Sequence, residues 1–196
     1  MGRMVRWEPG ARDRLQAAAL DLYATRGFDE TTVAEIALAA GLTERTFFRH
    51  FADKREVIFG RQETFQGGFV EHIASGEVGG PPLAIVAAAV TAAADFFRDE
   101  RLPYSRHRQA VVDSHPELRE RELLKMAALA GAIAQALRER GIAEPAATLA
   151  AESGVTVFRV AFAQWLAPES TRPLADIERE IFAELQSLTA AASLTR

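Results

Sequence analysis

The residues best suited to chemistry stand between positions 41 and 51, in the stretch GLTERTFFRHF. Two arginines, a histidine and two threonines lie there among three phenylalanines. Arginine can donate paired hydrogen bonds to guanine in the major groove, while hydroxyl groups bond to phosphate or touch a thymine methyl. This set therefore suits the recognition of double-stranded DNA. A packed helix with a solvated basic face has the same composition, so the neighbouring elements must decide between the two interpretations.

Other kinds of site find little support in the sequence. The chain has no cysteine, which leaves out disulfides, thiolate metal sites and cysteine nucleophiles. Its four histidines (His50, His72, His107, His115) do not have the spacing of a zinc protease or a comparable site. We therefore expect no cofactor, no metal site and no catalytic residue, and a small helical enzyme is the weakest alternative.

The bulk composition is that of an ordinary globular protein of 196 residues, 48% hydrophobic and 26% charged. The formal net charge is -4, and residues 1–61 hold ten basic and nine acidic residues, so the acidity lies in the remainder. The N-terminus has no apolar signal segment, and the longest nearly uncharged run, Leu83–Ala94, is shorter than the roughly 20 residues of a membrane crossing. We expect a cytoplasmic protein that does not enter a membrane.

Helical patterns separated by glycine and proline account for nearly the whole chain, and strand patterns are almost absent. We predict an all-α fold of about nine helices, with SGEVGGPP at 75–82 as the clearest loop. The fourth helix is expected to begin at Asp53, because Asp53 and Glu56 have the spacing of an N-cap and its capping-box acid. The predicted helices span about 11–26, 33–40, 43–51, 53–75, 83–98, 104–113, 115–140, 145–166 and 173–191.

The second and third predicted helices are joined by Gly41 and Leu42 alone. So tight a connection is the helix-turn-helix arrangement, which needs a glycine at the turn and a small residue, here Ala37, where the helices touch. On the third helix, the 100° step per residue places Phe47 and Phe51 on one face. The opposite face carries Arg45, Phe48 and Arg49, and a helix of this size fits a major groove about 12 Å wide. The turn and the caps favour DNA recognition over a merely solvated face.

The stretch DETTVAEIALAAGLTERTFFRHFADKREVIFG resembles the DNA-binding domain of the TetR family of transcriptional regulators. The resemblance covers residues 11–60, about a quarter of the chain. It implies an N-terminal three-helix helix-turn-helix domain over 1–60 and a helical ligand-binding and dimerisation domain over 61–196. The family pattern is met at Thr32, Val33, Ile36, Ala37, Ala40, Gly41, Thr46, His50, Phe51, Lys54 and Val57 or Ile58.

The resemblance also assigns roles to single residues. It implies phosphate contacts from Thr32, Thr43, His50 and Lys54, and base contacts from Arg45, Thr46 and Arg49. Phe48 stands where the family usually has a phosphate-binding tyrosine, so it can only pack against the sugar-phosphate backbone. Arg3 and Arg6 either form a minor-groove arm or belong to a disordered tail.

For the second domain, the resemblance implies a small-molecule site and a homodimer formed by the last two helices. The last helix has an apolar stripe (Leu174, Ile177, Ile181, Leu185, Leu188), which packing within one chain would also produce. The residues expected to line the ligand site are Phe96, Phe97, His107, Arg108, Met126, Phe158, Phe162 and Trp165, although each aromatic would equally suit a core. Arg108 and the following SHPELRERE resemble a branch of the family with acyl-chain ligands.

Together these features predict a ligand-responsive transcriptional repressor. As a homodimer it would bind a palindromic operator, and a small apolar or amphipathic effector would release it. The fourth helix, weakened by Gly67-Gly68, is the expected connection between the effector site and DNA. The alternative is a helical small-molecule-binding protein without a function on DNA.

Overall fold

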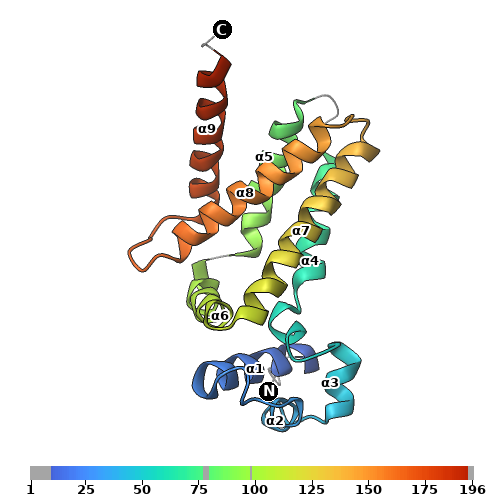
Figure 1. Ribbon diagram of the computed structural model, residues 1–196, viewed down its shortest axis with the longest axis vertical. Coiled ribbons are helices and arrows are strands. Elements are labelled where there is room, and N and C mark those ends of the chain that lie inside the picture. The colour runs from blue at the N-terminus through green and yellow to red at the C-terminus, as the bar shows by residue number, and fades with distance from the viewer. Residues whose placement is uncertain (1–9, 77–79, 98, 194–196) are drawn as a thin grey trace, which may run out of the picture. The chain divides into compact units, whose positions relative to one another are not determined.

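The computed structural model describes residues 10–76, 80–97 and 99–193, which leaves Arg3 and Arg6 outside the described part. Within these residues the chain forms nine α-helices and three short 3-10 helices, with no strand (Figure 1). The all-α prediction is confirmed. The α-helices are α1 (Ala11–Arg26), α2 (Val33–Ala39), α3 (Glu44–His50), α4 (Gln62–Ser75), α5 (Pro82–Ala93), α6 (Leu102–Ser114), α7 (Pro116–Glu139), α8 (Ala146–Leu166) and α9 (Leu174–Ser193).

The predicted start of the fourth helix was wrong. Asp53 does bond to the backbone ahead of it, since its Oδ1 accepts hydrogen bonds from the backbone N–H groups of Arg55 (2.8 Å) and Glu56 (3.1 Å). The segment that follows is only the 3-10 helix η1 (Glu56–Phe59), and α4 begins at Gln62. The chain turns at Gly60, where a Cβ atom would lie 2.7 Å from Cε1 of Phe51. Glycine permits this close packing against a side chain nine positions earlier, and no local pattern predicts the contact.

The predicted fifth helix was too long. It ends at Ala93 and continues as the 3-10 helix η2 (Ala94–Phe96), with Phe97 in a non-helical conformation. A third 3-10 helix, η3 (Asp99–Arg101), precedes α6.

By its contacts the chain forms two compact units. The first takes in residues up to 61 together with Arg106–Glu122, and the second takes in Gln62–Ser105 and the residues from Leu123 onward. The sequence-based division assigned Arg106–Glu122 to the second domain. These residues join the first unit because Val111, Val112 and Leu118 are buried in its core. The assignment of DNA binding to 1–60 and ligand binding to 61–196 stays a prediction.

The second unit is built around α8, which packs against α5 and α9. Its buried face carries small residues, and at Gly154 a Cβ atom would lie 2.2 Å from Cγ1 of Val86, so glycine permits the close approach of α5. By length and composition alone, α8 could cross a membrane. In this structure its apolar residues form part of the core, since nine residues of α8 are buried inside this unit.

Candidate nucleic-acid interface

The turn between α2 and α3 is closed by backbone hydrogen bonds. Gly41 has a φ of 66°, a left-handed conformation that a side chain would strain. Its N–H donates to the carbonyl of Leu38 (2.9 Å), and the N–H of Leu42 donates to the carbonyl of Ala37 (2.8 Å). This pair of bonds is a Schellman motif, which ends α2 and redirects the chain within two residues. The predicted helix-turn-helix connection is therefore present.

Both helices of the motif start at a threonine cap. The hydroxyl of Thr32 accepts from the N–H of Glu35 (3.2 Å), and Glu35 accepts from the N–H of Thr32 (2.9 Å), which completes a capping box. Bonds to the Thr32 backbone and hydroxyl, with a bond from Arg26, lower the pKa of Glu35 to about 2. The Thr43 hydroxyl accepts from the N–H of Thr46 (3.2 Å) and caps α3.

Helix α3 has one buried face and one exposed face. Phe47 is fully buried and packs edge-on against Phe48 and at a tilt against Phe51, with ring centroids 5.5 and 5.6 Å apart. Arg45 and Arg49 are exposed, and Phe48 is 55% exposed. The packing of Phe47 thus fixes the rotation of α3 about its axis, and the two arginines and Phe48 point outward as the 100° periodicity predicts.

Arg45 and Arg49 have no carboxylate partner in the described part of the chain, a property they share with Arg12, Arg14 and Arg119 of this unit; they are the two that lie together on the exposed face of α3. Five others pair with acidic side chains: Arg26 with Glu35, Arg55 with Asp53, Arg61 with Asp13, Arg108 with Glu122 and Arg121 with Glu56. An exposed, unpaired guanidinium keeps all its donors available for a base edge or a phosphate.

Lys54 makes contacts that its expected phosphate-binding role does not include. Its ammonium donates to the carbonyls of Phe28 (2.9 Å), Thr31 (3.1 Å) and Asp29 (3.4 Å) and lies 4.3 Å from the centre of the Phe28 ring. An ammonium has three N–H donors, and here they face three acceptors. In this structure Lys54 joins the chain after α3 to the loop between α1 and α2. Its contact with phosphate stays a prediction.

The remaining predicted DNA ligands are partly engaged. The Thr46 hydroxyl lies 3.1 Å from that of Thr43, so one of the two hydroxyls donates a hydrogen bond to the other. His50 is half-buried against Phe51, and its Nε2 atom is buried with no hydrogen-bond partner in the described part of the chain. Thr32, the N-cap residue of α2, remains exposed.

Sequence patterns of known families match both parts of the chain. The pattern of the bacterial regulatory proteins of the tetR family matches residues 15–59, and that of the MftR C-terminal domain matches residues 80–190. The second match alone spans more than half of the chain. The chain belongs to the TetR family. Members of this family are DNA-binding regulators of transcription, and this chain has the helix-turn-helix that the sequence predicts.

Similar proteins include regulators and solved TetR-family structures. The HTH-type transcriptional regulator TcmR of Streptomyces glaucescens is 36% identical over 91 residues, which are 46% of this chain and 40% of TcmR, so the match spans less than half of that relative. FadR of Thermus thermophilus, a TetR-family repressor solved in complex with lauroyl-CoA, is 25% identical with a TM-score of 0.52, over 89% of this chain and 93% of that one. FadR of Bacillus halodurans, a fatty acid degradation regulator, shares the fold at 18% identity and a TM-score of 0.54, over 92% and 96% of the two chains.

The residues predicted to line a ligand site do not form one group. Phe96, Phe97, Phe158, Phe162 and Trp165 form an aromatic cluster in the second unit, with ring centroids 5.0–6.1 Å apart, and Met126 packs on the same core. Sequence analysis missed Phe65 of α4, whose ring lies 5.3 Å from those of Phe97 and Phe158. His107 and Arg108 belong to the first unit. A role of these residues in ligand binding stays a prediction.

Arg108 joins the start of α7 to η1 within the first unit. Its Nε donates to the carbonyl of Ile58 (3.2 Å), its Nη1 pairs with Glu122 (3.1 Å), and its guanidinium lies 4.9 Å from the centre of the Phe59 ring. Arg121 pairs with Glu56 of the same 3-10 helix. Nothing in the local sequence indicated the contacts with Ile58 and Glu56, because these partners lie 50 and 65 positions away from Arg108 and Arg121.

The turn between α6 and α7 contacts the loop that Lys54 also holds. Nε2 of His115 lies 3.1 Å from Oδ2 of Asp29, and its ring centroid lies 4.6 Å from that of Phe28. Tyr23 donates from its hydroxyl to the carbonyl of Lys54 (2.5 Å). Burial, with the nearby charge of Asp53, raises the pKa of Tyr23 well above its ordinary value, so the phenol stays a donor. These contacts hold the α1–α2 loop and the segment after α3 together.

Proposed function

We propose that this regulator is a homodimeric repressor that works in the cytoplasm, binds a palindromic operator through α3, and leaves it when a small amphipathic effector binds. The observation that carries the DNA part is the exposed pair Arg45 and Arg49 on α3, neither of which has a carboxylate partner in the described part of the chain. In the major groove each guanidinium could donate to O6 and N7 of one guanine. Thr43 and Thr46, at the start of the same helix, supply hydroxyls for phosphate or a thymine methyl.

A homodimer is proposed because one short helix makes too few base contacts to select a site, while two copies fix two half-sites. The predicted apolar stripe on α9 has a buried part and an exposed part. Leu174 and Ile177 are buried in their own chain, so they already serve its core. Leu188 of α9 is 63% exposed, and Val160 of α8 is 42% exposed. These exposed apolar side chains support a contact with a second copy.

The proposed response to an effector uses helices that have residues in both units. Helix α7 contributes Pro116–Glu122 to the first unit and its remaining residues to the second. In the first unit, Arg121 pairs with Glu56, and Arg108 of α6 contacts the Ile58 carbonyl. A shift of α6 or α7 would therefore act on η1, which follows α3 closely in the chain. We propose this connection in place of a continuous fourth helix.

The proposed effector class draws on two observations. FadR of Thermus thermophilus binds lauroyl-CoA, which combines an apolar acyl chain with an anionic head. The second unit of this chain has an apolar core rich in alanine and phenylalanine, of the kind that packs against alkyl chains. An amphipathic effector with an anionic end fits both.

The decisive experiment selects bound DNA from a random pool and measures affinity by gel shift. We expect a two-fold symmetric site, and we expect Arg45→Ala or Arg49→Ala to cost about 1–3 kcal/mol on it and to relax the preference at one base pair per half-site. Arg61→Ala is the matched control, because Arg61 is also exposed in the first unit but pairs with Asp13. No enrichment of any sequence would favour the alternative, a ligand-binding protein without a function on DNA.

A further inference from the structure

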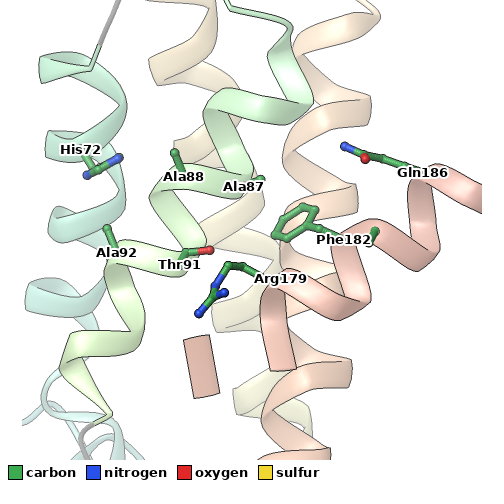
Figure 2. A pocket seen from close by; sticks show the side chains of 9 residues that line it. His72, Ala87, Ala88, Thr91, Ala92, Arg179, Phe182 and Gln186 are labelled. Carbon is green, nitrogen blue, oxygen red and sulfur yellow. The ribbon is translucent and has the colours of Figure 1, made fainter. Parts of the chain in front are cut away.

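A groove with a volume of about 570 Å³ lies between α5 and α9 in the second unit, beside α4 (Figure 2). Small-molecule sites in proteins typically have volumes of roughly 300–1,000 Å³. The residues that line this groove are different from those the sequence predicted for a ligand site. The predicted aromatic residues instead pack on one another, with each ring centroid within 6.1 Å of another.

Small side chains explain why the groove is hollow. Four of its nine lining residues are alanines: Ala87, Ala88 and Ala92 on α5, and Ala183 on α9. A methyl group fills little of the space between two packed helices, so the backbones leave a trough that longer side chains would close. The side chain of Phe182, which is 4% exposed, forms part of the wall. The floor and wall of the groove are therefore apolar.

The polar groups of the groove favour an anion. Arg179 of α9 and His72 of α4 line it together with the hydroxyl-bearing Thr91, and none of the nine lining residues is acidic. Figure 2 shows the Arg179 side chain extending from α9 into the groove. Arg179 pairs with Asp176, one turn earlier on α9, and its side chain remains 66% exposed. Since a guanidinium has five N–H donors, it can hold a second anion beside this partner.

We propose that the groove binds a small amphipathic anion, with an alkyl chain along the alanines and an anionic head on Arg179. We further propose that this groove is the effector site, a step that rests on the proposed function. A second copy of the chain fits the groove less well. A two-fold interface uses the same patch of both copies, so it would bring both Arg179 side chains into one contact. No acidic residue lines the groove to pair with these two positive charges.

The test is calorimetry on the full-length protein without DNA, with sodium decanoate as the anionic probe and decyltrimethylammonium as its cationic counterpart. We expect decanoate to bind and the cation to bind at least about tenfold more weakly. Arg179→Gln should lower decanoate affinity by about tenfold or more, since it removes a charged hydrogen-bond donor. Ala183→Phe should abolish binding, because the exposed position allows the ring to fill the groove without disturbing the core.

Arg172→Gln is the matched control, because Arg172 is an exposed arginine next to α9 that pairs with Glu180 and does not line the groove. It should leave decanoate affinity unchanged. Equal affinities for the Arg179 and Arg172 variants, or no decanoate binding by the wild type, would overturn the proposal. If Ala183→Phe converted a wild-type dimer to monomer, the occupant would be a second copy, and the proposal would also be wrong.

A gel shift with operator DNA separates this proposal from the proposed function. If decanoate binds in the groove while the operator stays bound, the groove holds an anion but is not the effector site. If the wild type binds no DNA at all, the proposed repressor function fails, and the calorimetric comparison of the two arginine variants still decides the groove.

Discussion

Helix α9 carries a fully buried carboxyl group, Glu178, whose oxygens have no hydrogen-bond partner in the described part of the chain. It lies among the buried residues Leu174, Ile177 and Phe182 of the same helix. Burial raises the pKa of Glu178 to about 8. The Glu178→Gln variant keeps the shape and polarity of the side chain but cannot ionise. A difference in pH dependence between wild type and variant therefore reports this group alone.

The size and sign of the effect follow from the two pKa values. In the unfolded chain Glu178 ionises near its ordinary pKa of 4.5, while in the folded chain it keeps its proton up to about pH 8. Between these values the folded state binds one proton more, so raising the pH destabilises it by about 1.4 kcal/mol per pH unit. From pH 4.5 to pH 7 the free energy of unfolding of the wild type should fall by about 3 kcal/mol relative to that of the Glu178→Gln variant. Above pH 8 the difference should level off near 5 kcal/mol, by the same reasoning.

The assay is urea unfolding followed by circular dichroism from pH 5 to pH 8. Protein concentration is held fixed, because the stability of a dimer depends on it. Glu180→Gln is the control, since Glu180 is 61% exposed and should give a curve parallel to the wild type. Parallel curves for Glu178→Gln and wild type would refute the argument, because they would mean that the carboxyl ionises normally in the folded protein.

Three further predictions concern the DNA-binding unit and the dimer. Lys54→Met should cost about 2 kcal/mol in urea unfolding, since three carbonyls lose their donor; unchanged stability with a flatter salt dependence of DNA binding would support the phosphate contact instead. Leu188→Asp should give folded monomers in sedimentation, and a persistent dimer would place the interface elsewhere. Arg121→Gln, which breaks the pair with Glu56, should keep operator affinity within about twofold but weaken release by effector; an unchanged effector response would exclude this contact from the coupling.

The sequence by itself determined the features that depend on neighbours within a few residues. The threonine caps at 32 and 43 and the glycine turn at 41 satisfy backbone groups one helical turn away, so their spacing is enough to predict them. The outward direction of Arg45 and Arg49 follows from helical periodicity once Phe47 is assigned to the core. The resemblance to the TetR family at residues 11–60 rests on the same short-range pattern, since its spacings serve this local geometry.

Only the tertiary structure decided the features that depend on distant partners. Lys54 meets the carbonyl of Phe28 across 26 positions, and Arg108 meets that of Ile58 across 50, so neither contact has a local signal. The break before α4 at Gly60 and the groove beside Ala183 arise where separate segments pack closely or leave a gap. Periodicity predicts which face of a helix is apolar, but not which other element that face packs against. The packing partner is determined by the tertiary structure, and it decides which polar groups are paired and which are available to a ligand.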